Sequence, residues 1–318
     1  MIAVLAGNPS VDRLHTVEIL RIGEIHRPVR VVTLPGGKGV NVARALRALD
    51  GDAHVFGVLG GYSGRWIADA LALEGIAATW AWSSSDTRSS FSVAQAARPG
   101  EPLTEFYEPA KPIAGEVWAE LELRVEEALG DVGTLCISGG LIPGAPVDAF
   151  ERAVRLAHDA GAKVALDSHG DAFAAALRAQ PDLVKVNAGE AAEALGLEPP
   201  EHETLDWATA AAVDLRGCLG ARGACVVTCG IRGMALVDDA GARYHGLLDE
   251  IGPYSVGSGD AVLAALALER GRGQPWPVAL RAAIGAAAAN AEVAGAGVLD
   301  RERAAEMARR ATVRRVAA

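Results

Sequence analysis

The residues best suited to chemistry form a glycine-rich segment late in the chain, Val256-Gly257-Ser258-Gly259-Asp260-Ala261-Val262. A helical pattern follows it, so the glycines place backbone N–H groups at a helix N-terminus, where they bind phosphate or a developing negative charge. Asp260 falls in the first helical turn, from which its carboxylate can accept a proton from an attacking hydroxyl. The segment therefore indicates phosphoryl transfer, which depends on positioning and charge stabilisation. The alternative is a turn in which Asp260 only caps the helix.

A second glycine-rich segment, early in the chain, combines a cation with an amide in Pro35-Gly36-Gly37-Lys38-Gly39-Val40-Asn41. Its glycines let a ligand approach the backbone, Lys38 supplies a positive charge, and Asn41 lies one turn into the next expected helix. The spacing fits neither the Walker A loop nor the Gly-x-Gly-x-x-Gly dinucleotide motif. The segment is a candidate ligand-binding loop, and an ordinary turn is the alternative.

Oxygen-bearing side chains follow two of the expected strands. Asn187 and Glu190 are spaced i, i+3 at a helix start and share a face. Carboxylate and amide oxygens suit Mg²⁺, bound through water molecules, whereas the alternative is a capping box that only satisfies the helix N-terminus. Asp12 follows the first strand, where a carboxylate can hold sugar hydroxyls; a surface turn is its alternative.

The fold that must position these segments alternates short apolar runs with amphipathic stretches. Strand-like runs cover residues 2–6, 54–59, 134–138, 163–167, 183–187 and 225–229, and helical patterns cover 65–73, 116–129, 146–160, 188–195, 207–219, 260–269 and 277–294. Continuous apolar strands separated by helices predict an α/β fold with a parallel sheet covered on both faces. Residues 13–34 and 87–108 are helix-poor and alternate with period two, which predicts antiparallel strands of a small separate sheet. We therefore expect one domain, residues 1–318, with a small β appendage.

The composition indicates an acidic globular protein. Hydrophobic residues make up 50% of the 318 residues, and 30 Lys and Arg against 40 Asp and Glu give a formal net charge of −10. This charge argues against nucleic acid or an anionic membrane as partner. The N-terminus lacks the pattern of a signal peptide and residues 282–298 read as a packed helix, so we expect a cytoplasmic protein. Without a Cys-x-x-Cys pair, we expect reduced, buried thiols at Cys136, Cys218, Cys225 and Cys229.

In their order and spacing, the four segments resemble the PfkB-type carbohydrate kinases of the ribokinase-like superfamily. The matching set is Asp12, Gly-Gly-Lys-Gly with Asn41, Asn187-x-x-Glu190, and Gly257-Ser258-Gly259-Asp260. The resemblance implies a three-layer α/β/α domain with a mostly parallel central sheet and a small β-sheet lid, formed by residues 13–34 and 87–108. It also implies ATP and Mg²⁺ as cofactors and leaves activation by K⁺ open.

The resemblance further implies a role for each matching residue. Asp260 is the expected catalytic base, with an anion hole formed by Gly257, Ser258 and Gly259. Asn187 and Glu190 are expected to organise Mg²⁺ through water. The implied sugar-side residues are Asp12, Gly37, Lys38, Asn41 and Ser138, and the implied nucleotide-side residues are Lys185, Asn187, Thr228, Gly230, Gly233, Ser255 and Asn290.

Within the family, the sequence is most similar to the phosphosugar branch, which contains 1-phosphofructokinases and tagatose-6-phosphate kinases. The similarity lies in residues 36–44, in residues 23–27 and in Thr87-Arg88. It implies phosphoryl transfer to a ketohexose phosphate: fructose 1-phosphate, tagatose 6-phosphate or fructose 6-phosphate. Such a substrate needs cations on the sugar side, which Lys38, Arg27 and Arg88 can supply; a solvated lid residue is the alternative for either arginine.

Four positions depart from the branch pattern, and two other functions stay open. Gly140 stands where serine is usual, Ile142 and Val186 where proline is usual, and His169 where a small hydroxyl residue is usual. The alternatives are a kinase of an unphosphorylated sugar or nucleoside, and a non-catalytic sugar-phosphate sensor on the same scaffold. Exposed apolar faces on the lid, at residues such as Phe91 and Val93, predict a homodimer through the lid.

Overall fold

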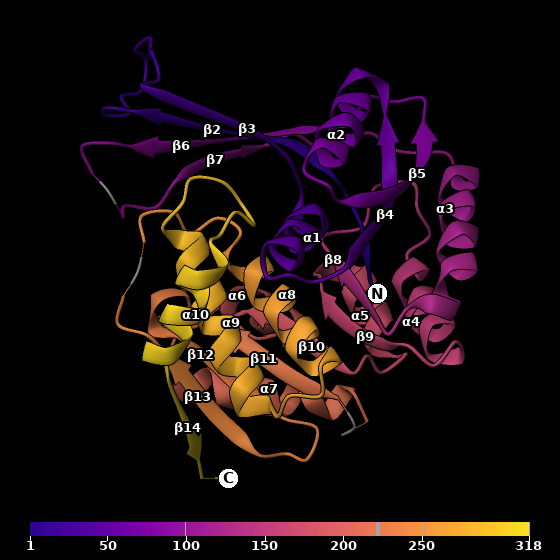
Figure 1. The fold of residues 1–318 in the computed structure, drawn as a ribbon, viewed down its shortest axis with the longest axis vertical. Coiled ribbons are helices and arrows are strands. Elements are labelled where there is room, and N and C mark those ends of the chain that lie inside the picture. The colour runs from indigo at the N-terminus through magenta and orange to yellow at the C-terminus, as the bar shows by residue number, and fades with distance from the viewer. Residues whose placement is uncertain (99, 221–222, 251, 318) are drawn as a thin grey trace.

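The computed structural model describes residues 1–98, 100–220, 223–250 and 252–317. Residue 99 of the expected lid range, and residues 221–222, 251 and 318 of the expected domain, lie outside the described residues. A large sheet of the described residues forms the centre of the molecule (Figure 1). Its strands, in spatial order, are β14 (Thr312–Val316), β13 (Arg243–Leu247), β12 (Met234–Val237), β11 (Ala224–Thr228), β10 (Leu183–Asn187), β9 (Lys163–Asp167), β8 (Thr134–Ser138), β1 (Ile2–Ala6), β4 (Ala53–Gly60) and β5 (Ala77–Ser83).

The sheet is parallel from β5 to β11, and its register aligns the carboxyl ends of the strands that carry the motifs. Ala6 of β1 pairs with Ser138 of β8, which pairs with Asp167 of β9. Farther along, Asn187 of β10 pairs with Thr228 of β11. The strands β12, β13 and β14 add antiparallel pairs at one edge. The loops that follow the parallel strands therefore meet at one edge of the sheet, where ligands bind in open α/β folds.

Helices cover both faces of this sheet because successive side chains of each strand point to opposite faces. In β1, Ile2 and Val4 pack in one hydrophobic cluster and Ala3 and Leu5 in the other. The first cluster receives α1 (Lys38–Ala48), α8 (Ser258–Gly271), α9 (Trp276–Ala291) and α10 (Arg301–Arg310), and α2 (Gly61–Leu73) joins it beside β4. The second receives α3 (Gly115–Ala128), α4 (Ala149–Asp159), α5 (Gly170–Leu177), α6 (Ala188–Leu195) and α7 (Leu205–Cys218). The expected three layers are confirmed.

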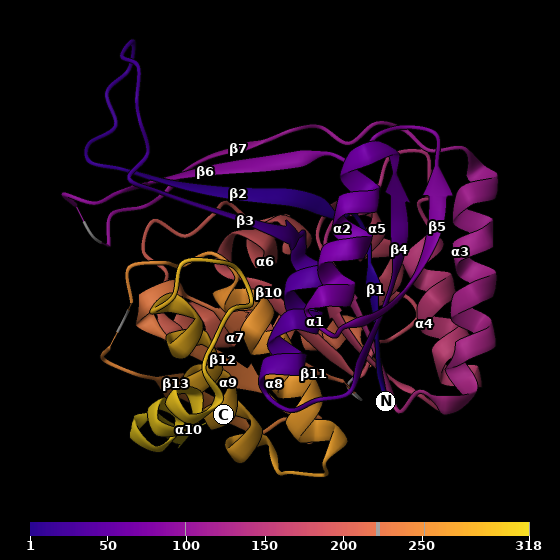
Figure 2. The same cartoon turned by 45° about the horizontal axis from the view of Figure 1, so that its top comes forward.

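A smaller sheet projects beyond the main body and carries a long connection, residues 18–29, at its tip (Figure 2). Its strand order is β3 (Arg30–Gly36), β2 (Ser10–Val17), β6 (Ser89–Gln95) and β7 (Thr104–Tyr107). The expected separate sheet is confirmed, but its strands are not all antiparallel, because β2 and β6 pair in parallel. These two strands come from different insertions, so no hairpin turn dictates their direction. Since β6 is an inner strand, Val93 is buried and Phe91 half-buried against His15 and Phe106, contrary to the expected exposed pair.

Several helices and strands, and the solvent exposure of one cysteine, differ from what the sequence analysis predicted. The strands β5, β12, β13 and β14, and the helices α5 and α10, were not predicted. All of these except the ten-residue α10 span only four to eight residues, which is too short for a clear periodic pattern. All four cysteines are free, and three are buried, but Cys218 ends α7 on the solvent side and is exposed. Among the described residues, none of the helices has the length and apolar character needed to span a bilayer.

Candidate active site

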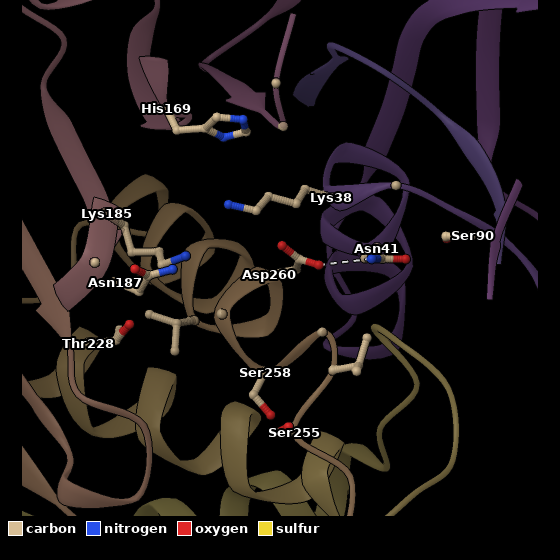
Figure 3. Close-up of a pocket in the computed structure, with 18 of the residues that line it drawn as sticks. Lys38, Asn41, Ser90, His169, Lys185, Asn187, Thr228, Ser255, Ser258 and Asp260 are labelled. Carbon is tan, nitrogen blue, oxygen red and sulfur yellow. Dashed lines mark hydrogen bonds between the residues drawn. The ribbon is translucent and has the colours of Figure 1, made fainter. Parts of the chain in front are cut away.

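A large cavity of about 1390 Å³ lies at the carboxyl ends of the parallel strands, and it brings together segments far apart in the sequence. Predicted site residues that line it are Asp12, Gly37, Lys38, Asn41, Arg88, Lys185, Asn187, Thr228, Gly230, Gly233, Ser255, Gly257, Ser258, Gly259 and Asp260. The sugar-side and nucleotide-side groups named from the sequence thus share one space. Figure 3 shows Asp260 between Lys38 and Asn41 on one side and Lys185 on the other.

The loop before α8 places Asp260 in the first turn of that helix. Gly257 precedes α8 with φ +82°, and a Cβ there would lie 2.6 Å from Cα of Ala296, so only glycine fits. The N–H of Ser258 donates to the carbonyl of Ser255 at 3.2 Å, and its hydroxyl donates to Ala287 O. The N–H groups of Gly257 and Gly259 therefore suit the expected anion hole better than that of Ser258.

The Asp260 carboxylate is 5% exposed and accepts a hydrogen bond from Asn41 Nδ2 at 2.9 Å. Its other oxygen points to the Lys38 side of the cavity (Figure 3). Burial, together with the negative charge of Asp167, raises the pKa of Asp260 to about 7, against the opposing effects of Lys185, Lys38 and Asn41. A carboxylate with such a pKa is suited to act as a general base near neutral pH.

Asp167 joins the two lysines of the site and was not predicted as a site residue. It is fully buried at the end of β9 and accepts hydrogen bonds from Lys38 Nζ at 3.0 Å and from Lys185 Nζ. Burial alone would raise the pKa of Asp167, but the two lysines outweigh it and hold the pKa below its usual value. Burial would likewise lower the pKa of Lys38, but Asp167 and Glu190 raise it instead. Lys38 therefore stays charged beside Asp260.

Asn187 and Glu190 form the capping box that the sequence analysis kept as an alternative. Asn187 Oδ1 accepts from the Glu190 N–H at 2.8 Å, and the Asn187 N–H donates to Glu190 Oε2 at 2.9 Å. The remaining Glu190 oxygen accepts from Lys38 Nζ at 2.6 Å. No group of three His, Cys, Asp or Glu able to hold a metal ion occurs among the described residues. The Glu190 carboxylate and the Asn187 amide oxygen fit a Mg²⁺ ion that is coordinated by phosphate oxygens and bound to the protein through water molecules.

The sugar-side end of the cavity combines hydroxyls, a carboxylate and a cation. Asp12 accepts hydrogen bonds from Ser10 and Ser90 and from the Gly37 N–H. Arg88 Nε donates to Asn8 Oδ1 at 3.2 Å and keeps its guanidinium on the cavity wall. His169 lines the same cavity, on the side of the Lys38 ammonium that faces away from Asp260 (Figure 3).

Four predicted site residues do not line the cavity, and one of them is Glu190, which contacts it only through Lys38. Arg27 is exposed in the β2–β3 connection, outside the lining residues. Ser138 is fully buried, and its hydroxyl lacks a hydrogen-bond partner among the described residues. Asn290 is fully buried as well, and its amide holds Val256 O at 2.8 Å and the Gly297 N–H at 2.8 Å. Asn290 thus braces the loop of the expected anion hole, in place of the expected nucleotide contact.

The fold and the site define a class of protein, and comparison with known proteins agrees with it. The sequence model of the pfkB family of carbohydrate kinases matches residues 4–302, so the chain belongs to that family and is a phosphotransferase acting on an alcohol group. This confirms the family expected from the sequence motifs.

Individual relatives show which members of the family this chain is similar to. A 1-phosphofructokinase of Haloferax volcanii is 33% identical over 306 residues, covering 95% of this chain and 94% of the relative. The crystal structure of phosphofructokinase-2 from Escherichia coli in complex with substrates and products matches with TM-score 0.87 and 25% identity, over 97% of this chain and 98% of that one. A possible 1-phosphofructokinase of Thermotoga maritima shares the fold, with TM-score 0.82 and 20% identity over 99% of both chains.

Proposed function

We propose that the protein transfers the γ-phosphoryl group of ATP to a hydroxyl of a phosphorylated ketohexose, with Asp260 as the catalytic base. The observation that carries this proposal is the placement of Asp260. It is a buried carboxylate with a pKa raised to about 7, beside two lysines and the N-terminus of α8 in one cavity. This combination suits proton removal from an alcohol while a phosphoryl group is transferred.

The reaction divides between the base and the groups that bear the transferring charge. The Asp260 oxygen that faces the cavity takes the hydroxyl proton, while Asn41 holds the other oxygen. The N–H groups of Gly257 and Gly259 and the positive end of α8 stabilise the developing negative charge. Lys38 and Lys185 add positive charge from the opposite sides of Asp260. Ordered donors of this kind lower the barrier because they need no rearrangement during the reaction.

The nucleotide side is the part of the cavity near the ends of β10 and β11. Asn187 and Thr228 end these strands, and Gly230, Gly233 and Ser255 line the same space. Mg²⁺ bound with ATP would neutralise phosphate charge near Glu190 and Asn187. For Glu190 to face that ion, Lys38 must move from Glu190 toward the substrate phosphate, so we infer that ATP and sugar binding redistribute this ion pair.

A phosphorylated ketohexose is the substrate class that the sugar side favours. Arg88 and Lys38 supply two cations to the cavity wall, and Asp12 with its two serine donors offers a hydroxyl-binding carboxylate. The Haloferax volcanii relative is a 1-phosphofructokinase, which favours fructose 1-phosphate as the acceptor. The projecting sheet would act as a lid that excludes water from this end of the cavity.

The test is ADP release over a substrate panel of fructose 1-phosphate, tagatose 6-phosphate, fructose 6-phosphate, fructose, ribose and adenosine. We expect the highest kcat/KM for a ketohexose phosphate, and turnover of free sugars alone would support the unphosphorylated-sugar alternative. Arg88→Ala should raise KM for phosphorylated substrates without an equal loss on free sugars. Arg30→Ala, an exposed lid arginine outside the cavity, is the matched control. Sugar-phosphate binding without ADP release would indicate a sensor.

A further inference from the structure

A buried arginine on α1 has no part in the mechanism described above, yet it contacts a residue that holds the base. Arg44 is 7% exposed and lies one helical turn after Asn41. Its Nη1 donates to Asn41 Oδ1 at 3.4 Å, and Asn41 Nδ2 donates to Asp260 Oδ2 at 2.9 Å. Arg44, Asn41 and Asp260 therefore form a continuous hydrogen-bonded series that ends on the carboxylate.

The Arg44 guanidinium is fixed by three further partners. Glu74 accepts from its Nε at 2.7 Å and from its Nη2 at 3.1 Å, which balances the buried charge. The carbonyl of Pro35 accepts at 2.7 Å, directly before the Gly36–Gly37 loop. The carbonyl of Ala296 accepts at 3.0 Å, and Ala296 packs against Gly257. Arg44 thus joins the base to the loops on both sides of it.

The direction of the Asn41 amide is the property that this arrangement controls. Arginine only donates hydrogen bonds, so it can bind the oxygen of Asn41 but not its NH₂ group. If the Asn41 amide were flipped, its oxygen would face the Asp260 carboxylate and its NH₂ group would face the Arg44 guanidinium. Acceptor would then face acceptor, and donor would face donor. With the oxygen held by Arg44, the NH₂ group must face Asp260, where it favours the ionised carboxylate.

We propose that Arg44 is a positioning residue. It orients the Asn41 amide so that the amide NH₂ group holds the Asp260 carboxylate and favours its ionised form for phosphoryl transfer. The proposal rests on the proposed role of Asp260 as base. The charged groups that face Asp260 are Lys38 from α1, Asp167 from β9 and Lys185 from β10, and all of them are kept in the variants below.

The experiment measures kcat against pH, using ADP release with saturating ATP and the best sugar phosphate. In the wild-type profile we expect an acidic limb, in which kcat falls as the pH is lowered. Arg44→Met should move this limb to higher pH by roughly half to one pH unit. At pH values below its midpoint, kcat should therefore be about three- to tenfold lower, with KM for ATP unchanged. Asn41→Ala should shift the acidic limb by a similar amount. The double variant, Arg44→Met with Asn41→Ala, should shift it no further, because both substitutions remove the same hydrogen bond from Asn41 to Asp260. Arg47→Met, an exposed arginine on the same helix, should leave the limb in place.

Arg44→Lys distinguishes the effect of the positive charge from that of the contact with Asn41. It also serves as the test if the Arg44→Met protein does not fold. A lysine keeps the positive charge beside Glu74 but has no planar fork to reach Asn41 as well. The limb should therefore shift as in Arg44→Met, and a wild-type limb in Arg44→Lys would overturn the proposal. Additive shifts in the double variant would overturn it too. If Asp260→Asn keeps wild-type turnover, the proposed function fails instead, and the two failures are distinguished.

Discussion

Asp260 has the surroundings of a base that ionises near neutral pH. Burial and the charge of Asp167 raise its pKa to about 7, while Lys185 and Lys38 act in the opposite direction and keep the shift moderate. An isolated buried carboxylate would stay protonated, and a fully paired one would be a weak base. The balance of these charges therefore decides whether the carboxylate can accept a proton.

The first prediction concerns the pH dependence of the reaction. The rate should fall as the pH drops below about 7, because Asp260 becomes protonated. Asp260→Asn should lower kcat by about 10²- to 10⁴-fold and keep ATP binding, measured by titration calorimetry. An acidic limb near pH 4 in the wild-type profile would contradict the assigned environment of the carboxylate.

The same group predicts a pH-dependent stability. The folded-state pKa of about 7 lies above the ordinary aspartate pKa of 3.8, so folding is penalised once the carboxyl of the unfolded chain ionises, and the penalty is complete above pH 7. At full size it is on the order of 4 kcal/mol. Asp260→Asn should thus raise Tm at pH 8 by several degrees and much less at pH 4.5, measured by calorimetry. The exposed Asp69→Asn on α2 is the control, and an equal Tm change at both pH values would argue against this linkage.

The residues of the site could be predicted from the sequence much better than their contacts. Asp260, Lys38 and Asn41 stand in short motifs, and the structure brings them into one cavity. Asp167 was missed because its lysine partners lie 129 and 18 residues away, and no local pattern reports such a pairing. Asn290 was assigned to the nucleotide because a sequence position does not reveal whether an amide faces a cavity or a neighbouring loop.

At the scale of elements, α6 shows how one segment serves folding and binding together. Asn187 ends β10 and caps α6, and Glu190 completes the capping box while it also pairs with Lys38. The sequence analysis set capping against metal binding as alternatives, but the cap leaves Asn187 on the cavity wall and Glu190 paired with Lys38, which lines the cavity. Most of the apolar parallel strands were predicted almost residue by residue, whereas the antiparallel strands β12 to β14 were missed, because their pairing depends on neighbours that a local pattern does not reveal.

Variants of Asn187 separate the two uses. Asn187→Ala should lower the free energy of unfolding by about 1 kcal/mol through loss of the cap, and Asn187→Ser should restore most of it. Both variants should raise KM for MgATP, because the shorter serine cannot reach the nucleotide. Thr204→Ala removes the α7 cap outside the cavity and should lower stability only. Recovery of both stability and KM in Asn187→Ser would show that Asn187 is a cap alone.

At the scale of the whole molecule, the projecting sheet leaves apolar side chains in solvent. Ile22 and Ile25 in the β2–β3 connection, Val31 of β3 and Phe106 of β7 are exposed, although monomeric proteins rarely gather such residues on one extension. We propose that a second copy covers them and that the dimer holds the lid over the sugar end. The exposed Arg27 in the same connection would then lie at the dimer contact.

Light scattering during gel filtration tests the dimer. Wild-type protein should elute at about twice the chain mass of 32.7 kDa. Val31→Asp should give a monomer with a higher KM for the sugar phosphate, because an unsupported lid closes less often. Leu73→Asp, which also charges an exposed apolar position but on α2, should stay dimeric. A wild-type monomer with full activity would disprove the lid dimer.

The central claim is that this cavity catalyses phosphoryl transfer from ATP to a sugar phosphate through Asp260. Phosphorus NMR of the protein with MgATP and fructose 1-phosphate tests it most directly, since it observes donor and product together. We predict loss of the ATP γ-phosphate signal and growth of a second phosphomonoester signal on the sugar, with neither change in Asp260→Asn. Formation of inorganic phosphate alone, or equal sugar phosphorylation by Asp260→Asn, would contradict it.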